Sequence, residues 1–258
     1  MSMSVQYRVG DEGVAAFERD GAIVLRNIVD ETWLNRLRTA IDRNLETDDW
    51  YFHYIYLWQR DPELYDFCFH SPIGEAASEL LRTSKVHLIY DQVFVKDALR
   101  TERTEWHNDQ PYWPVRGPTL SIWVAIDETT QQTGAMEFIR GSHRWNRWFE
   151  IVGPNLPPEV NPKFEKIPDY ESQRDDHEIL TWDLAPGDAV AFHGLAVHAS
   201  YPFVHPVRRR AYSLRFAAKE AIYAEESGAL PRFCNPELRE GQPLDSEKYP
   251  AVFIRPES

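Results

Sequence analysis

Apolar residues recur at helical spacing through the first third of the chain. Residues 14–19 form one short apolar-faced segment, and residues 22–29 form an apolar, β-branched stretch typical of a strand. Asp30 is a suitable N-cap for a longer helix, in which apolar residues follow every three or four positions. Pro62 is suited to the first turn of a further helix, and the helical pattern then continues to Leu81 with one break at a Ser-Pro pair. We expect these helices to pack against a core.

The pattern changes to strands after Lys85. Short segments rich in β-branched and aromatic residues follow, and Gly, Pro or Asp separate them. The expected strands cover residues 86–90, 92–95, 120–126, 135–139, 189–192 and 211–216. Helices followed by a run of strands indicate an α+β fold with a closed or two-sheet β core.

No internal repeat or Gly/Ser-rich linker divides the chain, so we expect one domain over residues 1–258. Its expected parts are a mostly helical cover (1–85), a β core (86–220) and a C-terminal tail (221–258). Within the core, the proline-rich and charged stretch 153–176 predicts a long loop, and long ordered loops often act as lids.

Composition and charge narrow the class of partner. Hydrophobic residues make up 43% and charged residues 27% of the 258 positions, which excludes a wholly disordered chain and a coiled coil. Lys and Arg total 28 against 41 Asp and Glu, and the net charge of −13 argues against nucleic acid or an anionic membrane as partner. The sequence has no apolar run as long as a membrane span and no signal-peptide core at its N-terminus. We therefore expect a cytoplasmic monomer or homodimer that acts on a small molecule.

His107 and Asp109 are the first candidate metal ligands. In an extended segment, residues two positions apart face the same way, so an imidazole nitrogen and a carboxylate oxygen can reach one ion. Such a pair is common by chance, but His198, which follows the apolar strand 189–192, adds a second imidazole. Two imidazoles and one carboxylate form the facial triad that suits iron(II) and leaves positions open for O2. His193 is the rival of His198, because both residues follow the same strand.

Arg209 lies within a run of three arginines, at the head of the expected strand 211–216. A guanidinium can bind a carboxylate through two parallel hydrogen bonds, so even an acidic protein can hold a dicarboxylate at one place. Beside a metal triad, this arginine suggests a site for 2-oxoglutarate. The flanking Arg208 and Arg210 are also consistent with a solvated surface.

The order of these motifs resembles that of a known family. The resemblance is carried by Arg209 and by the segments 107–114 (HNDQPYWP), 123–127 (WVAID), 134–143 (GAMEFIRGSH) and 186–198 (PGD to His198). Together they are similar to the phytanoyl-CoA dioxygenase family of iron(II)- and 2-oxoglutarate-dependent oxygenases. The resemblance implies a double-stranded β-helix, a jelly-roll or cupin-like core, with packing helices mainly from the N-terminal third.

The resemblance also implies roles for particular residues. His107, Asp109 and His198 would be the iron ligands, and Arg209 would bind the distal carboxylate of 2-oxoglutarate. Further residues fall where relatives line the co-substrate, and these are Thr104, Trp123, Ser200 and Lys96.

Candidate substrate residues come from two places. Trp113 stands where a related hydroxylase has an aromatic side chain beside co-substrate and substrate. Gln92, Phe94 and Arg116 are candidates as well, although packing or an exposed strand explains them equally. Tyr54 belongs to the aromatic segment 50–58, which is interpreted either as core packing or as a pocket wall.

The expected activity is hydroxylation of a C–H bond in a small organic metabolite, with Fe(II) as cofactor, 2-oxoglutarate and O2 as co-substrates, and succinate and CO2 as products. Relatives that halogenate have a small residue at the carboxylate position, so Asp109 favours hydroxylation. Three alternatives stay open. The same site could perform desaturation, cyclisation or endoperoxidation, the chain could be a cupin-like metal protein or isomerase that does not use O2, or it could be a silent binding domain, which the intact triad argues against.

Overall fold

A computed structural model describes residues 7–45, 54–97, 103–151, 164–205, 207–225 and 229–255 of the protein. The largest sheet within these residues has six strands. All neighbouring strands in this major sheet are antiparallel. In spatial order the strands are β1 (Ala22–Leu25), β7 (Ala189–His193), β4 (Thr119–Ala125), β9 (Arg209–Ala218), β2 (Lys85–Lys96) and β11 (Ala251–Ile254).

A smaller antiparallel sheet faces the major sheet. It consists of β6 (Ile179–Thr181), β5 (Met136–Ile139) and β8 (His198–Ser200). Phe138 of β5 packs on Phe192 of β7, with 5.2 Å between the ring centroids, so aromatic side chains fill part of the space between the sheets. Two opposed antiparallel sheets are the arrangement of a jelly roll, which confirms the expected α+β fold with a double-stranded β-helix core. A short pair, β3 (Val115–Arg116) with β10 (Ile222–Tyr223), lies at one end.

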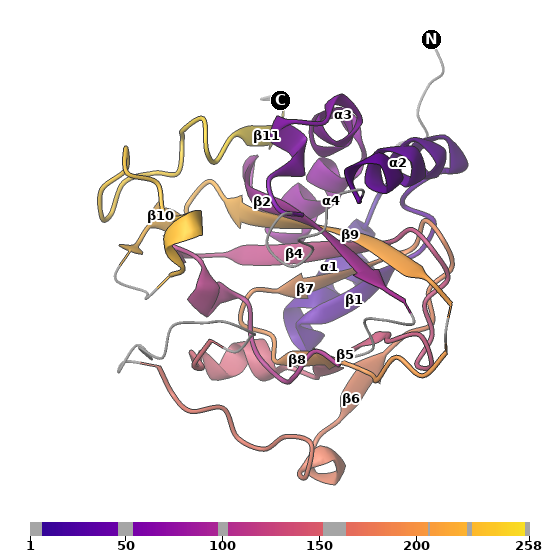
Figure 1. Ribbon diagram of the computed structural model, residues 1–258. Coiled ribbons are helices and arrows are strands. Elements are labelled where there is room, and N and C mark those ends of the chain that lie inside the picture. The colour runs from indigo at the N-terminus through magenta and orange to yellow at the C-terminus, as the bar shows by residue number, and fades with distance from the viewer. Residues whose placement is uncertain are drawn as a thin grey trace.

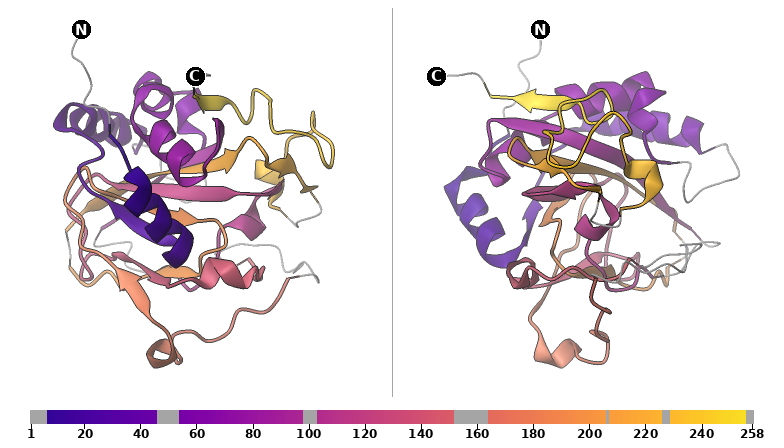
Figure 2. Two further views of the ribbon diagram at one scale, coloured as in Figure 1. Left: turned by 180° about the vertical axis from the view of Figure 1, so that it is seen from behind. Right: turned by 90° about the vertical axis from the view of Figure 1, so that its left-hand side faces the viewer.

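Helices cover the other face of the major sheet (Figures 1 and 2). They are α1 (Gly10–Asp20), α2 (Glu31–Asn44), α3 (Pro62–His70) and α4 (Ile73–Leu80). Asp30 caps α2 as expected, because its carboxylate accepts a hydrogen bond from the Trp33 amide at 2.9 Å. Short 3-10 turns occur at Leu57–Gln59, Gln110–Tyr112, Ser142–Trp145, Arg174–Asp176 and Pro231–Phe233. Among the residues that the structure describes, no helix is long and apolar enough to cross a membrane.

Side chains along β2 alternate between a buried face and a partly exposed face of the strand. Val93 and Val95 are buried in the cluster that α2 to α4 form with the major sheet. Gln92, Phe94 and Lys96 point the other way, toward the smaller sheet, and all three stay partly exposed. Solvent therefore reaches the inner face of the major sheet along this part of β2.

The structure differs from the expected strands in two ways. Residues 86–90 and 92–95 form one strand, β2, whose register with β9 shifts between Leu88 and Tyr90. The strands β6, β8 and β11 were not expected, since segments of three or four residues hold too few alternations to be recognised. The tail is not separate from the core, because β11 pairs with β2 at the edge of the major sheet.

Candidate active site

Three side chains from two distant segments converge between the sheets. His107 and Asp109 precede the turn Gln110–Tyr112, and His198 begins β8. One potential ligand atom from each of the three residues lies within 4.8 Å of the others. The Nε2 atoms of His107 and His198 lie 3.5 Å and 3.7 Å from the same carboxylate oxygen of Asp109. This spacing fits one metal ion bound by all three.

Hydrogen bonds fix the orientation of each potential ligand. Nδ1 of His107 contacts the Glu105 carbonyl at 2.7 Å, and Nδ1 of His198 contacts the Ala196 carbonyl at 3.0 Å. A carbonyl can only accept, so each Nδ1 donates and each Nε2 keeps a lone pair for a metal. Ser121 Oγ donates to the second carboxylate oxygen of Asp109 at 2.9 Å, which leaves the first oxygen directed at the two imidazoles.

Electrostatics favour the protonation states that a metal needs. Burial, together with the neighbouring His107, lowers the pKa of His198 to about 3, so this imidazole is neutral at pH 7. Burial would raise the pKa of Asp109, but the adjacent imidazoles and the Arg215 guanidinium outweigh burial and hold that pKa below its usual range. Neutral imidazoles and an ionised carboxylate are the forms that bind a divalent cation.

The rival ligand His193 lies outside this group. Its ring stands 5.2 Å from that of His143 and 6.4 Å from that of Phe17, and its Nδ1 accepts a hydrogen bond from the Leu195 amide at 3.0 Å. Burial lowers its pKa to about 4. His193 therefore ends β7 on the face of the major sheet that Ala189 and Ala191 share, where it packs against α1 and not beside Asp109.

Arg209 is buried at the start of β9, with 3% of its surface exposed. Its guanidinium lies over the Trp123 ring at 5.1 Å, and its Nε donates to the Thr133 carbonyl at 3.2 Å. Burial lowers the pKa of Arg209 to about 10. Among the residues that the structure describes, no carboxylate forms an ion pair with it, so the guanidinium is suited to an anionic ligand.

The other predicted co-substrate residues surround the same place. Lys96 is the register partner of Arg209 in the pair β2 and β9. Its Nζ donates to Ser200 Oγ at 3.1 Å, and the backbone amide of Thr104 donates to the same oxygen at 2.9 Å. Ser200 stands two residues after His198 in β8, so these groups lie beside the triad.

The predicted substrate residues divide into two groups. Gln92 and Phe94 lie on the inner face of β2 and are partly exposed there. Trp113 is completely buried, and its Nε1 donates to the Tyr90 hydroxyl at 3.3 Å. Its ring therefore packs behind Tyr90.

Two predicted residues are not brought to the triad. Tyr54 is 2% exposed and packs in the cluster under the helices, which corresponds to the core-packing interpretation. Residues 50–53 of the aromatic segment lie outside the described residues. Arg116 is exposed on β3 and pairs with Glu240 at 3.7 Å, because its strand lies at one end of the molecule. A substrate contact by either residue stays a prediction, and both positions correspond to the packing or exposed-strand alternative.

Part of the expected lid-like loop is fixed near the site. Residues 152–163 lie outside the described residues. Beyond them, Arg174 forms an ion pair with the buried Glu137 of β5 at 2.8 Å. Glu171 accepts a hydrogen bond from Trp106 Nε1 at 3.0 Å and pairs with Arg103 at 3.0 Å. The end of the loop is therefore tied to the segment that carries His107.

Sequence reasoning missed Arg215 and Ser121. Arg215 lies on the inner face of β9, and its register partner in β4 is Ser121, which orients Asp109. The signal was available, because residues at intervals of two from Arg209 share one face of a strand.

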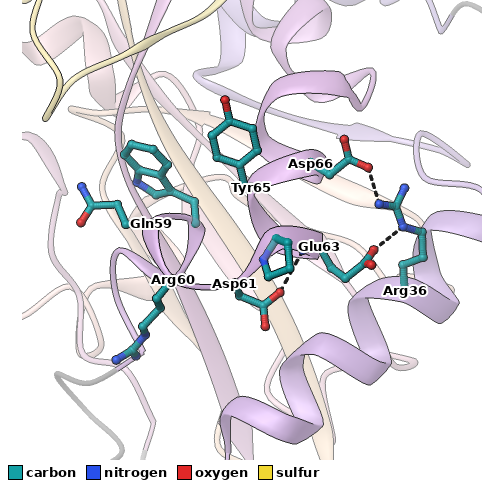
Figure 3. A pocket seen from close by; sticks show the side chains of 9 residues that line it. Arg36, Gln59, Arg60, Asp61, Glu63, Tyr65 and Asp66 are labelled. Carbon is teal, nitrogen blue, oxygen red and sulfur yellow. Dashed lines mark hydrogen bonds and ion pairs between the residues drawn. The ribbon is translucent and has the colours of Figure 1, made fainter.

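A surface hollow over α2 and α3 is separate from the triad (Figure 3). Its charges are already paired within the protein. Arg36 Nε donates to Glu63 at 2.5 Å, and the same guanidinium contacts Asp66. Asp61 accepts two hydrogen bonds from Arg43 and caps α3. We assign no chemistry to this hollow.

A comparison with known protein families identifies the chain. The profile of the family described as phytanoyl-CoA dioxygenase (PhyH) matches residues 17–211. The chain therefore belongs to the phytanoyl-CoA dioxygenase family of iron(II)- and 2-oxoglutarate-dependent oxygenases, as the motifs indicated.

Curated relatives agree with this family. A probable phytanoyl-CoA dioxygenase of Caenorhabditis elegans is 23% identical over 151 residues, which cover 54% of this chain and 46% of the relative. The peroxisomal phytanoyl-CoA dioxygenase of Homo sapiens is 25% identical over 180 residues, which cover 66% of this chain and 51% of the relative. The matches thus span about half the length of these two relatives. Since the human protein is named as peroxisomal, the cytoplasmic location of this chain stays a prediction.

Solved structures share the fold along nearly the whole chain. The non-haem α-ketoglutarate-dependent carbocyclase SnoK from nogalamycin biosynthesis has a TM-score of 0.77 at 22% identity, covering 94% of this chain and 96% of its own. The epimerase SnoN in complex with Fe3+, α-ketoglutarate and nogalamycin RO has a TM-score of 0.73 at 21% identity, covering 93% of this chain and 96% of its own.

Proposed function

We propose that this protein hydroxylates a C–H bond of a small organic molecule, using iron(II), 2-oxoglutarate and O2. One oxygen atom of O2 enters the substrate and the other enters succinate, while 2-oxoglutarate loses CO2 and supplies the two electrons that balance the reaction. The observation that carries this proposal is the convergence of His107, Asp109 and His198 beside a buried arginine that forms no ion pair with any carboxylate among the described residues.

The triad is proposed to hold iron(II) through two Nε2 atoms and one carboxylate oxygen. Bound iron would supply the activation of O2 and the oxidation of the C–H bond. The chain contributes orientation. The carbonyls of Glu105 and Ala196 keep both imidazoles in the metal-binding tautomer, and Ser121 holds the carboxylate of Asp109.

Arg209 is proposed to bind the distal carboxylate of 2-oxoglutarate. A buried guanidinium forms strong paired hydrogen bonds with a carboxylate, because water does not compete there. Lys96, the register partner of Arg209, adds a positive charge, and Ser200, which is hydrogen-bonded to Lys96, adds a hydroxyl. The guanidinium of Arg209 packs over the Trp123 ring. Together these groups would orient 2-oxoglutarate toward the triad.

Asp109 supports hydroxylation over halogenation, since the carboxylate occupies the position that a halide would need. Gln92 and Phe94 are proposed to contact the substrate from the inner face of β2. A substrate held there would lie on the same side of the major sheet as the triad.

Oxidative ring closure or epimerisation is a second candidate function. The observation that favours it is the fold shared with SnoK, a carbocyclase, and SnoN, an epimerase. Ring closure would remove two hydrogens from the substrate, with O2 as the oxidant, and epimerisation would remove one hydrogen and replace it from an external reductant. Both differ from hydroxylation because no oxygen atom enters the substrate.

The test is incubation of the purified protein with iron(II), 2-oxoglutarate, O2 and a panel of metabolites. Succinate formation and a product that has gained one oxygen atom would support hydroxylation. A product that has lost two hydrogens would favour ring closure or desaturation. Turnover without O2, or without succinate, would contradict both and favour a metal-dependent isomerase.

A further inference from the structure

Arg215 is a second buried arginine on the inner face of β9. It is 5% exposed, and its guanidinium lies over the rings of Tyr90 at 4.7 Å and Phe94 at 5.4 Å. Its register partners are Tyr90 on β2 and Ser121 on β4. Because Ser121 holds the carboxylate of Asp109, Arg215 lies near that ligand on the inner face of the major sheet.

The donors of Arg215 are only partly used. Nη1 donates to the Ser213 carbonyl at 3.1 Å, while Nε is buried without a hydrogen-bond partner among the described residues. None of the ion pairs between described residues includes Arg215, and its effect on Asp109 is a longer-range Coulombic one. Ser213 Oγ, on the same face of β9, is also buried without a partner.

A buried guanidinium with a free donor is costly for a protein to keep. The loss of hydration disfavours the charge, and contacts with two aromatic faces offset only part of that loss. Such an arrangement is stable when an acceptor completes it, and a carboxylate matches the fork of an arginine better than other acceptors. Arg215 therefore has the features of a binding group whose anion comes from outside the chain.

The two buried arginines lie at different positions along the inner face of β9. Arg209 lies by Trp123 and Lys96, whereas Arg215 lies by Tyr90 and Ser121. Six residues separate them, which corresponds to about 20 Å along an extended strand. A 2-oxoglutarate held by Arg209 would therefore leave the Arg215 donors to another molecule.

We propose that Arg215 determines substrate specificity by binding a carboxylate of the molecule that is oxidised, so that the substrate is an organic acid. This inference rests on the proposed function, because it assigns the substrate class of the same site. The rings of Tyr90 and Phe94 hold the guanidinium in place, and the carboxylate of the acid would supply the acceptor that the buried Nε lacks among the described residues. The competing explanation is that Arg215 serves only to stabilise the ionised Asp109.

The test measures binding without turnover. Protein loaded with iron(II) and 2-oxoglutarate under anaerobic conditions is titrated by calorimetry with aliphatic and aromatic carboxylic acids and with their primary amides. Wild type is expected to bind its preferred acids about ten- to a hundredfold more tightly than the matching amides. Arg215→Met should remove this preference and leave the affinity for 2-oxoglutarate unchanged, and Arg215→Lys should retain part of it.

Arg209→Met is the matched control, since it should lose 2-oxoglutarate and not the discrimination between acid and amide. Failure of wild type to bind 2-oxoglutarate in the presence of iron(II) would refute the proposed function and is seen before any acid is added. The inference about Arg215 is overturned if the acid preference survives in Arg215→Met, if wild type binds none of the acids, or if both Arg215→Met and Arg215→Gln fail to fold.

Discussion

His107 and His198 pair through their main chains. The amide of each donates to the carbonyl of the other, at 2.9 Å and 2.8 Å, and their rings lie 4.2 Å apart between centroids. This isolated bridge joins the segment before the turn Gln110–Tyr112 to the first residue of β8. Because the backbone sets the distance between the two imidazoles, the metal site is built by the same hydrogen bonds that close the β core.

Asp109→Ala should abolish turnover and leave the fold intact. The substitution removes the anionic ligand, while the backbone bridge between His107 and His198 does not depend on it. Succinate formation measures turnover, and circular dichroism with a thermal melt measures the fold. Full activity in this variant would remove the carboxylate from the mechanism.

Arg209→Ala should raise the concentration of 2-oxoglutarate needed for half-maximal activity. Removal of one partner from a buried charge pair costs about 2 to 5 kcal/mol, which corresponds to roughly thirty- to several-thousandfold in affinity. The matched control is Arg208→Ala, since Arg208 is exposed and pairs with Asp42 at 2.8 Å. An equal effect of both substitutions would show that the loss is not specific to the buried guanidinium.

Ser121→Ala should weaken iron binding about ten- to a hundredfold, because hydrogen bonds to a ligating carboxylate orient it. The measurement is an anaerobic iron(II) titration in the absence of substrate. Ser213→Ala provides the control, as this serine lies on the same face of the sheet and its hydroxyl has no partner in the described residues. If Ser121→Ala binds iron like wild type, the hydrogen bond to Asp109 has no role in metal affinity.

The metal-free protein should lose stability as the pH falls below the pKa of an ordinary histidine. Burial lowers the pKa of His193 to about 4 and that of His198 to about 3. Between these values and the ordinary histidine pKa, the unfolded chain therefore binds protons that the folded chain does not bind. The free energy of unfolding should therefore decrease as the pH falls from about 6.5 toward these values. Thermal melts across this range test the slope.

His193→Gln should flatten that slope, because this substitution removes one of the buried imidazoles with a lowered pKa. A slope that is the same in His193→Gln and wild type would mean that another group controls the acid sensitivity.

Much of the site was predictable because its residues are tied to recognisable local patterns. His107 and Asp109 alternate on an extended segment, and His198 follows an apolar strand. Arg209 was found because it heads a strand beside these ligands. In each case one side chain has a chemical identity that few other positions share, so a resemblance in motif order was enough to place it.

The rest depends on which face of an element points inward. Arg215 was overlooked because the run of three arginines drew attention to the start of β9, although the alternation continues along that strand. Tyr54 sits in a segment with no clear period, so its direction toward the helices could not be read from the sequence. Arg116 belongs to a two-residue strand whose place is set by pairing with β10 in the C-terminal tail.

Anaerobic titration of iron(II) into the wild type and four single variants tests the central claim most directly. We predict one iron per chain in the wild type, a large loss of affinity in His107→Ala, Asp109→Ala and His198→Ala, and near wild-type binding in His193→Ala. Retention of iron by His198→Ala together with its loss from His193→Ala would contradict the assignment of the triad.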